Sequence, residues 1–290
     1  MEKIFIDENI NILTGNDAEK ALEQMNDKKY LSDNNGIIQV SKKRWESAQK
    51  AEKKHWLAKG TSSIDDRNIY HSNQFHNYSS LKKAKFSHAL EIGSGPFTNL
   101  RIIGTKCKIE KCTLLDPLIT EYLNHPYCSY NENHLVLDKK PRISKILKKV
   151  SPTLFSYLKT NFFSRIQIDQ LISLPLEEAD LTKPYDLVVM INVIEHCYDI
   201  NKVFNNILKV TPKGSYFIFE DKLYDQEKIK KEISTNYDAA HPLKVDKSVI
   251  ENFLNKNFKP VYKNVKTNRT EFQNQVIIWD DIYYIGKRDS

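Results

Sequence analysis

Two glycines and an acidic residue define the most informative segment of this 290-residue chain. Glu91 ends a short apolar run, Gly93 and Gly95 follow it, and Pro96 then opens a helix-like stretch. This pattern is typical of a nucleotide-binding turn, because Gly93 permits the tight turn and Gly95 lets a ligand approach bare backbone. A dinucleotide fingerprint needs a third glycine where Thr98 stands. The acid at position 91 suits a ligand that carries an ammonium group.

Other polar residues fall at the ends of predicted strands. Asp116 ends a second apolar run, 21 residues after Gly95, and Pro117 keeps its backbone extended. An acid about 20 residues beyond a glycine turn can accept hydrogen bonds from ribose hydroxyls. Asn192 follows the clearest apolar run, residues 186–191. Ligands bind at the carboxyl ends of parallel strands, so we expect these residues at one edge of a sheet.

Alternating strands and helices must position these side chains. We expect strands at 89–92, 112–115, 165–168, 186–191 and 215–219, with two more around 260–265 and 276–285. Helical spacing is found at 41–59, which carries two tryptophans, at 199–208 and at 247–254. The alternation predicts a parallel, doubly wound sheet. The connection after residue 116 is longer than a crossover helix needs. Its additional residues, about 124–160, are rich in basic and aromatic side chains, and they predict a helical insertion over the edge of the sheet where the ligand binds.

Composition narrows the class of protein. A hydrophobic content of 40% supports a packed core, and no apolar run approaches the roughly 20 residues of a membrane span. The first residues hold no signal-peptide pattern, so a cytoplasmic location is expected. The four cysteines form no metal-binding pair, and no metal site is predicted. A net charge of +7 allows an anionic small-molecule acceptor, but no motif points to nucleic acid.

Four segments in order resemble the motifs of class I S-adenosylmethionine-dependent methyltransferases. They are Glu91–Gly95, Leu115–Asp116, Pro184–Asp199 and Leu208–Phe219, and they are most similar to the small-molecule "type 11" branch. The resemblance implies a Rossmann-like, seven-stranded, doubly wound sheet whose last strand is antiparallel, with S-adenosyl-L-methionine as the cofactor. It implies a methyltransferase domain at 86–290, containing the insertion, after an N-terminal helical extension or cap at 1–85. A weaker likeness of Lys43–Trp56 is to the leader helices of surface-glycan methyltransferases.

The resemblance also implies roles for individual residues. The region of Glu91 and Gly93 would contact the methionine end of the cofactor, Gly95 would allow close approach, and Asp116 would bind the ribose. Pro117 would flank the adenosine, and Asn192 and Val193 would present carbonyl groups to the amino-acid moiety. Asp169 and Gln170 compete for the place of an acid that meets the adenine. For Asn192, a simple turn at the strand end is an equal alternative.

Two histidines are the candidates for catalysis. Methyl transfer is an in-line displacement that depends mainly on alignment, and a hydroxyl acceptor also benefits from a general base. His196 follows the 186–191 strand, and His241 lies in a later loop. Each could serve as a base or substrate contact, or simply support a turn. The expected reaction is O-methylation of a glycan, a nucleotide sugar or another biosynthetic intermediate.

Two alternatives stay open from the sequence. One is a noncatalytic scaffold that binds S-adenosylmethionine. The other is an NAD-dependent reductase or epimerase, which would use a Tyr-x-x-x-Lys pair such as Tyr198 and Lys202. The missing third glycine counts against the reductase. So does Asp199, whose position as a helix cap would leave Tyr198 outside the helix.

Overall fold

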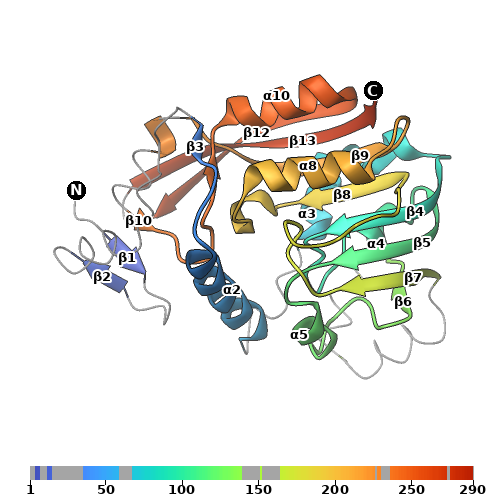
Figure 1. Ribbon diagram of the computed structural model, residues 1–290, viewed down its shortest axis with the longest axis horizontal. Helices are drawn as coiled ribbons and strands as arrows, with labels where there is room; N and C mark the ends of the chain where they lie inside the picture. Colours follow the sequence, from blue (N-terminus) through green and yellow to red (C-terminus); the bar gives the residue numbers. More distant parts are fainter. Residues whose placement is uncertain are drawn as a thin grey trace.

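The strand order of the main sheet explains why distant polar residues meet at one edge. The computed structural model describes residues 4–6, 12–14, 35–58, 67–138, 151, 164–225, 227–229, 236–272 and 275–289. Within them, the main sheet has eight strands in the order β12-β13-β9-β8-β4-β5-β7-β6 (Figure 1). Its parallel centre consists of β4 (Lys85–Ile92), β5 (Lys108–Leu115), β7 (Arg165–Ile172), β8 (Leu187–Ile191) and β9 (Tyr216–Leu223). Because β4 pairs with both β5 and β8, the chain reverses its direction of winding there, where ligands bind in such sheets.

The two edges of the sheet complete the predicted fold. The last strand, β13 (Gln275–Arg288), runs antiparallel between β9 and β12 (Phe258–Phe272). The Rossmann-like sheet with an antiparallel last strand is therefore confirmed. At the other edge, β6 (His134–Val136) pairs antiparallel with β7 and adds an eighth strand from the start of the predicted insertion. The helices predicted for that insertion fall mostly on residues 139–150 and 152–160, which lie outside the described residues.

Helices cover both faces of the sheet because the central strands are apolar on both sides. Every residue of β8 is buried, and its alternate side chains enter two separate cores. One core holds Val188 and Met190 with α8 (Ile200–Val210) and α10 (Lys247–Asn257). The opposite core holds residues from α4 (Leu100–Ile103) and η2 (His76–Leu81), together with Phe75, the C-cap of α3 (Asn68–Gln74). A short helix, α5 (Ile119–Leu123), follows β5.

The start of α8 decides one of the alternatives. The Asp199 carboxylate accepts hydrogen bonds from the N–H groups of Asn201 and Lys202, both at 3.1 Å, and so caps the helix. Tyr198 therefore lies outside the helix, and its hydroxyl donates to Glu178 at 3.0 Å. The pair Tyr198 and Lys202 does not share a helical face, as a reductase would require.

The N-terminal region joins the rest of the chain through several small elements. Helix α2 (Lys42–Leu57) begins at the cap Ser41 and stands across the carboxyl ends of the central strands (Figure 1). The strands β1 (Ile4–Ile6) and β2 (Ile12–Thr14) pair with each other, and β1 also pairs with β10 (Asn236–Tyr237). Likewise, β3 (Gly36–Ile37) pairs with β11 (Lys244–Val245). Besides the predicted helices, this region thus supplies strands that pair with later segments. Among the helices described, none has the length and apolar character needed to cross a membrane.

Candidate active site

A cavity lies at the carboxyl ends of β4, β5 and β8. It has a volume of about 480 Å³, within the usual range for small-ligand sites. Its walls come from α2, the glycine turn after β4, the loop after β5, and three later segments around residues 175–177, 191–197 and 238–241. The cavity therefore brings together segments from both halves of the chain.

The two glycines of the turn are needed for different structural reasons. Gly93 has φ +68°, and a Cβ on it would lie 2.4 Å from Cγ2 of Val193, so packing alone excludes a side chain there. Gly95 has φ +52°, and a Cβ on it would meet no atom within 4 Å, although this residue lines the cavity. Gly95 therefore leaves free space that a bound molecule can use. The Gly95 carbonyl accepts a hydrogen bond from the Tyr130 hydroxyl at 2.9 Å, which holds the turn from the start of the insertion.

Asp116 links this turn to the loop after β5. Its Oδ2 accepts a hydrogen bond from the Gly95 N–H at 3.0 Å, and its Oδ1 accepts one from the Leu118 N–H at 2.9 Å. Burial raises the pKa of Asp116 to about 6 against the effect of these two bonds. Leu115 and Pro117 line the cavity on either side of it. The carboxylate is thus held in place by backbone donors at the cavity wall.

The Glu91 carboxylate does not face the cavity, although the resemblance implied a contact with the cofactor. Its carboxylate accepts hydrogen bonds from the Thr98 hydroxyl, from the Asn99 N–H at 2.7 Å and from the Leu100 N–H at 3.3 Å. Glu91 therefore caps the start of α4 from behind the turn, and it is not among the cavity-lining residues. Burial raises its pKa to about 7. Thr98, which stands where a third glycine would, supplies a hydroxyl to this buried acid.

Asn192 and Val193 line the cavity as expected. Asn192 has φ +57°, an uncommon conformation for a residue other than glycine, and its N–H donates to the Glu220 carbonyl at 2.9 Å. The Val193 carbonyl already accepts a hydrogen bond from the His196 N–H at 2.9 Å. The turn after β8 therefore forms a wall of the cavity with a strained backbone conformation that backbone hydrogen bonds hold, and the Val193 side chain packs on Gly93.

Asp169 and Gln170 do not reach the cavity. Strand β7 continues to Ile172, so both residues lie inside the strand and not beyond its end. Asp169 pairs with Lys111 at 3.0 Å and Lys183 at 3.1 Å, and hydrogen bonds from these lysines lower its pKa. Gln170 is exposed. The wall expected from them comes instead from residues 175–177, which no polar motif had marked.

His196 and His241 meet at the far end of the same cavity. Their ring centroids lie 4.6 Å apart, although the two residues are 45 positions apart in the sequence. His196 belongs to the short helix η3 (Ile194–His196), and His241 lies between β10 and β11. His241 Nδ1 lies 2.7 Å from the Asp238 carboxylate, which fixes the orientation of the ring. Both predicted catalytic histidines are therefore at the site, beside one another.

Burial and nearby charges act differently on the two rings. Burial lowers the pKa of His196, which favours the neutral imidazole. Burial also opposes protonation of His241, but Glu195 and Asp238 outweigh it and raise the pKa of that ring. Glu195 is itself buried and is held by the Lys222 ammonium at 2.9 Å and 3.0 Å.

Helix α2 supplies site residues that sequence analysis did not single out. The side chains of Trp45, Gln49, Glu52 and Trp56 all line the cavity. The Trp45 indole N–H donates to the His196 carbonyl at 3.0 Å, and the Trp56 indole N–H donates to Glu52 at 3.0 Å. Their spacing of four, three and four residues places them on one helical face, which was the signal available in the sequence. Through its indole, Trp45 docks the helix on the loop after β8.

The family of the chain follows from its sequence together with this fold. The methyltransferase-domain family matches residues 64–252, which is more than half of the chain. The chain therefore belongs to this family and is a class I methyltransferase that uses S-adenosylmethionine.

Solved structures with a similar fold are distant in sequence. The N-methyltransferase NodS from Bradyrhizobium japonicum WM9, in complex with S-adenosyl-L-homocysteine, is 12% identical with a TM-score of 0.49, over 85% of this chain and 99% of that one. A 1,6-didemethyltoxoflavin-N1-methyltransferase from Burkholderia thailandensis is 10% identical with a TM-score of 0.46, over 90% and 98%. A Leishmania major S-adenosylmethionine-dependent methyltransferase is 13% identical with a TM-score of 0.46, over 98% and 96%. No curated protein matches the sequence.

Proposed function

We propose that this enzyme transfers a methyl group to a hydroxyl oxygen of a small, neutral acceptor. The observation that carries the proposal is the continuity of the cavity. Its walls run without interruption from Gly95 and Asp116 to the histidine pair His196 and His241. The cofactor and the acceptor can therefore lie end to end, as an in-line displacement requires.

The glycine side of the cavity fits the cofactor. The open space at Gly95 accepts a bound molecule against the backbone, and the Asp116 carboxylate can accept hydrogen bonds from ribose hydroxyls. The apolar side chains Leu115, Pro117 and Leu118 suit the adenine ring. S-adenosylmethionine supplies the methyl group from its sulfonium. Among the predicted contacts we retain Gly93, Gly95, Asp116, Pro117, Asn192 and Val193, with Glu91 in a supporting role.

The histidine side of the cavity fits a hydroxyl acceptor. Burial keeps His196 neutral, so it can accept a proton, and Asp238 orients the ring of His241. A positioned base of this kind contributes about 10²- to 10⁴-fold in rate. An acceptor of low reactivity, such as a sugar hydroxyl or a phenol, gains most from it. Helix α2 closes this side, so residues 1–85 act as a cap on the 86–290 domain in this proposal.

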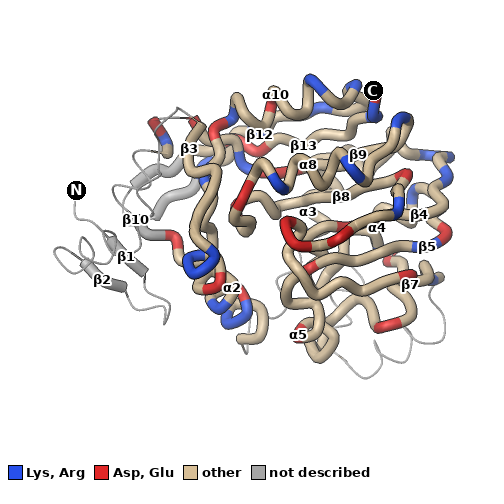
Figure 2. Tube along the Cα trace, in the orientation of Figure 1, with Lys and Arg blue, Asp and Glu red and all other residues tan. Residues whose placement is uncertain are grey.

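The charge of the cavity favours a neutral acceptor over an anionic one. The acidic lining residues are Glu52, Asp116, Glu177, Glu195 and Asp238, against only Arg67 and Lys222 among the described cavity residues. The lysines that give the chain its charge of +7 lie elsewhere. Figure 2 shows Lys and Arg along α8 and α10, at the amino ends of β4 and β5, and also on α2; the Lys and Arg residues of α2 are not among those that line the cavity. Sugars and phenols therefore fit this site better than nucleotide sugars do.

A two-stage experiment tests the proposal. Calorimetry with S-adenosylhomocysteine first measures cofactor binding. Mass spectrometry then follows transfer of a trideuterated methyl group from S-adenosylmethionine to panels of neutral sugars, phenols, nucleotide sugars and amines. We expect labelled product from a neutral hydroxyl acceptor. Labelling of amines or nucleotide sugars alone would contradict the proposal, and tight binding without any labelling would favour the scaffold alternative.

A further inference from the structure

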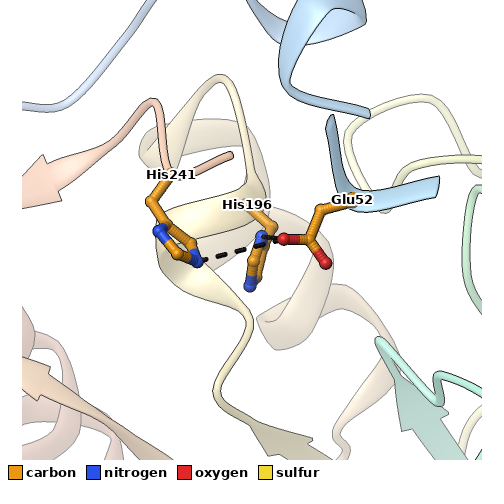
Figure 3. Close-up of side chains that lie close together, drawn as sticks. All are labelled: Glu52, His196 and His241. Carbon is orange, nitrogen blue, oxygen red and sulfur yellow. Dashed lines mark ion pairs between the residues drawn. The ribbon is translucent and has the colours of Figure 1, made fainter. Parts of the chain in front are cut away.

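Three side chains at the acceptor end of the cavity converge on one point. Nδ1 of His196 lies 3.7 Å from Oε1 of Glu52, and Nε2 of His241 lies 4.0 Å from the same oxygen (Figure 3). One ligand atom from each residue lies within 4.8 Å of the others. These separations are too long for hydrogen bonds. They are close to the spacing of about 3.4 Å between two ligands that bind one zinc ion at about 2.1 Å in a tetrahedron.

The burial of these atoms leaves their polar groups incompletely satisfied. Nδ1 of His196 is buried and makes no hydrogen bond. Oε2 of Glu52 accepts from the Trp56 indole, whereas Oε1 faces the two imidazoles. Within the described part of the chain, no lysine or arginine pairs with Glu52, while Lys222 pairs with Glu195 and Lys244 with Asp238. No lysine or arginine among the described residues therefore neutralises the Glu52 carboxylate where the three ligand atoms meet.

The surroundings hold the three groups as a metal site requires. Metal-binding histidines usually donate their second ring N–H to a carboxylate, which fixes the tautomer and the ring orientation. His241 has this arrangement, since its Nδ1 lies 2.7 Å from Asp238, while its Nε2 faces Glu52 at 4.0 Å and Glu195 at 3.5 Å. The loop that carries His196 is fixed by the Trp45 and Gln49 side chains, which donate to the His196 carbonyl at 3.0 Å and 3.4 Å.

We propose that Glu52, His196 and His241 bind a divalent transition-metal cation of the zinc type, with a fourth position open to the cavity. Two nitrogen ligands and one carboxylate suit zinc, cobalt or iron(II) better than magnesium or calcium. Three protein ligands with an open position are typical of catalytic sites. The cation would bind the acceptor oxygen and ease loss of its proton to water. The histidines then act as ligands and not as bases. The metal site stands on its own geometry, but this role rests on the proposed O-methylation.

Metal binding can be measured on the full chain without any acceptor. Chelator-treated protein is titrated with Zn²⁺ by calorimetry and with Co²⁺ by visible absorption, which reports a low-symmetry nitrogen and oxygen site. We expect one equivalent of either ion in the parent. Asp238→Asn should weaken binding about 10- to 100-fold, as loss of an outer partner does, and Glu52→Gln, His196→Gln and His241→Gln should weaken it more. His76→Gln is the matched control, because His76 is exposed and outside the cavity, and it should bind as the parent does.

The outcomes separate this inference from the proposed function. Affinity for S-adenosylhomocysteine, measured on each variant, shows whether the fold and the cofactor site survive. Absence of stoichiometric Zn²⁺ and Co²⁺ binding in the parent overturns the metal site, as does equal binding by His241→Gln and His76→Gln. If the site binds metal but only amines are methylated, the metal site stands and the proposed O-methylation fails. If neutral hydroxyls are methylated equally well after chelation, the catalytic role of the cation fails and the histidine base stands.

Discussion

Replacing Gly95 by alanine separates ligand contact from backbone conformation. Gly95 has φ +52°, and a Cβ there meets no protein atom within 4 Å. The cost to the fold is therefore limited to placing alanine in the left-handed region, about 1–2 kcal/mol. In the complex, the added methyl would occupy space that the cofactor uses. Overpacking of this kind costs about 1–3 kcal/mol, which corresponds to about a 5- to 150-fold loss of S-adenosylhomocysteine affinity.

The chain offers a matched control for the same change. Gly214 also has a positive φ, +89°, and open space around its Cβ. It lies in the turn before β9, at the amino end of the sheet and away from the cavity. Gly214→Ala should lower the melting temperature by a similar amount and leave affinity unchanged. Gly93→Ala should destabilise the protein more than either, because its Cβ would lie 2.4 Å from Val193.

For the three variants, calorimetry measures the affinity for S-adenosylhomocysteine, and thermal unfolding measures the melting temperature. The reasoning is refuted if Gly95→Ala binds the ligand as tightly as the parent does. It is also refuted if Gly214→Ala loses the same affinity, because the loss would then follow from general destabilisation. Only a loss confined to the variants of the glycine turn agrees with a cofactor lying against Gly95.

Three further predictions address the acids and the histidines. Asp116→Ala should lower S-adenosylhomocysteine affinity about 10- to 100-fold by calorimetry, and should lower the melting temperature because the Gly95 and Leu118 N–H groups lose their acceptor. The free energy of unfolding of the parent should fall as pH rises from about 4.5 to about 7. Burial raises the pKa of Glu91 from 4.5 to about 7, so the folded state keeps this proton at pH values where the unfolded state has lost it. In denaturant titrations at several pH values, Glu91→Gln should reduce this pH-dependent change in unfolding free energy by at most about 3 kcal/mol. An unchanged dependence of unfolding free energy on pH would contradict the raised pKa of Glu91. His241→Ala should lower kcat by about 10²-fold or more with little change in cofactor affinity, whether the ring is a base or a ligand, and near-normal kcat would exclude both roles.

Apolar runs and glycine spacing were enough to predict the central sheet. The strands expected at 89–92, 112–115 and 186–191 correspond to β4, β5 and β8, and the two predicted C-terminal strands form β12 and β13. Strands buried on both faces need continuous apolar residues, so they can be predicted from the sequence without tertiary information. The placement of Asp116, Asn192 and Val193 followed from the same logic, because residues after parallel strands share one edge.

Errors at the site came from strand ends and from side-chain direction. Strand β7 continues four residues beyond the predicted end at 168, which places Asp169 among lysines and away from the cavity. Glu91 has the predicted position on its strand, but its carboxylate faces the start of α4. Neither the end of a strand nor the direction of a buried side chain is encoded in local residue patterns, since both depend on which neighbours pack against them.

The sequence by itself determined the sheet, the glycine turn and the family of the enzyme, because these depend on local periodicity and on residues close together in the chain. Only the tertiary structure brought Glu52 from α2 against His196 and His241, which lie 144 and 189 positions later. Helix α2 docks there through Trp45, whose indole binds the loop that carries His196. A contact of this kind arises from packing between segments that share no local pattern. The sequence therefore identified both histidines, and the fold supplied the carboxylate that faces them.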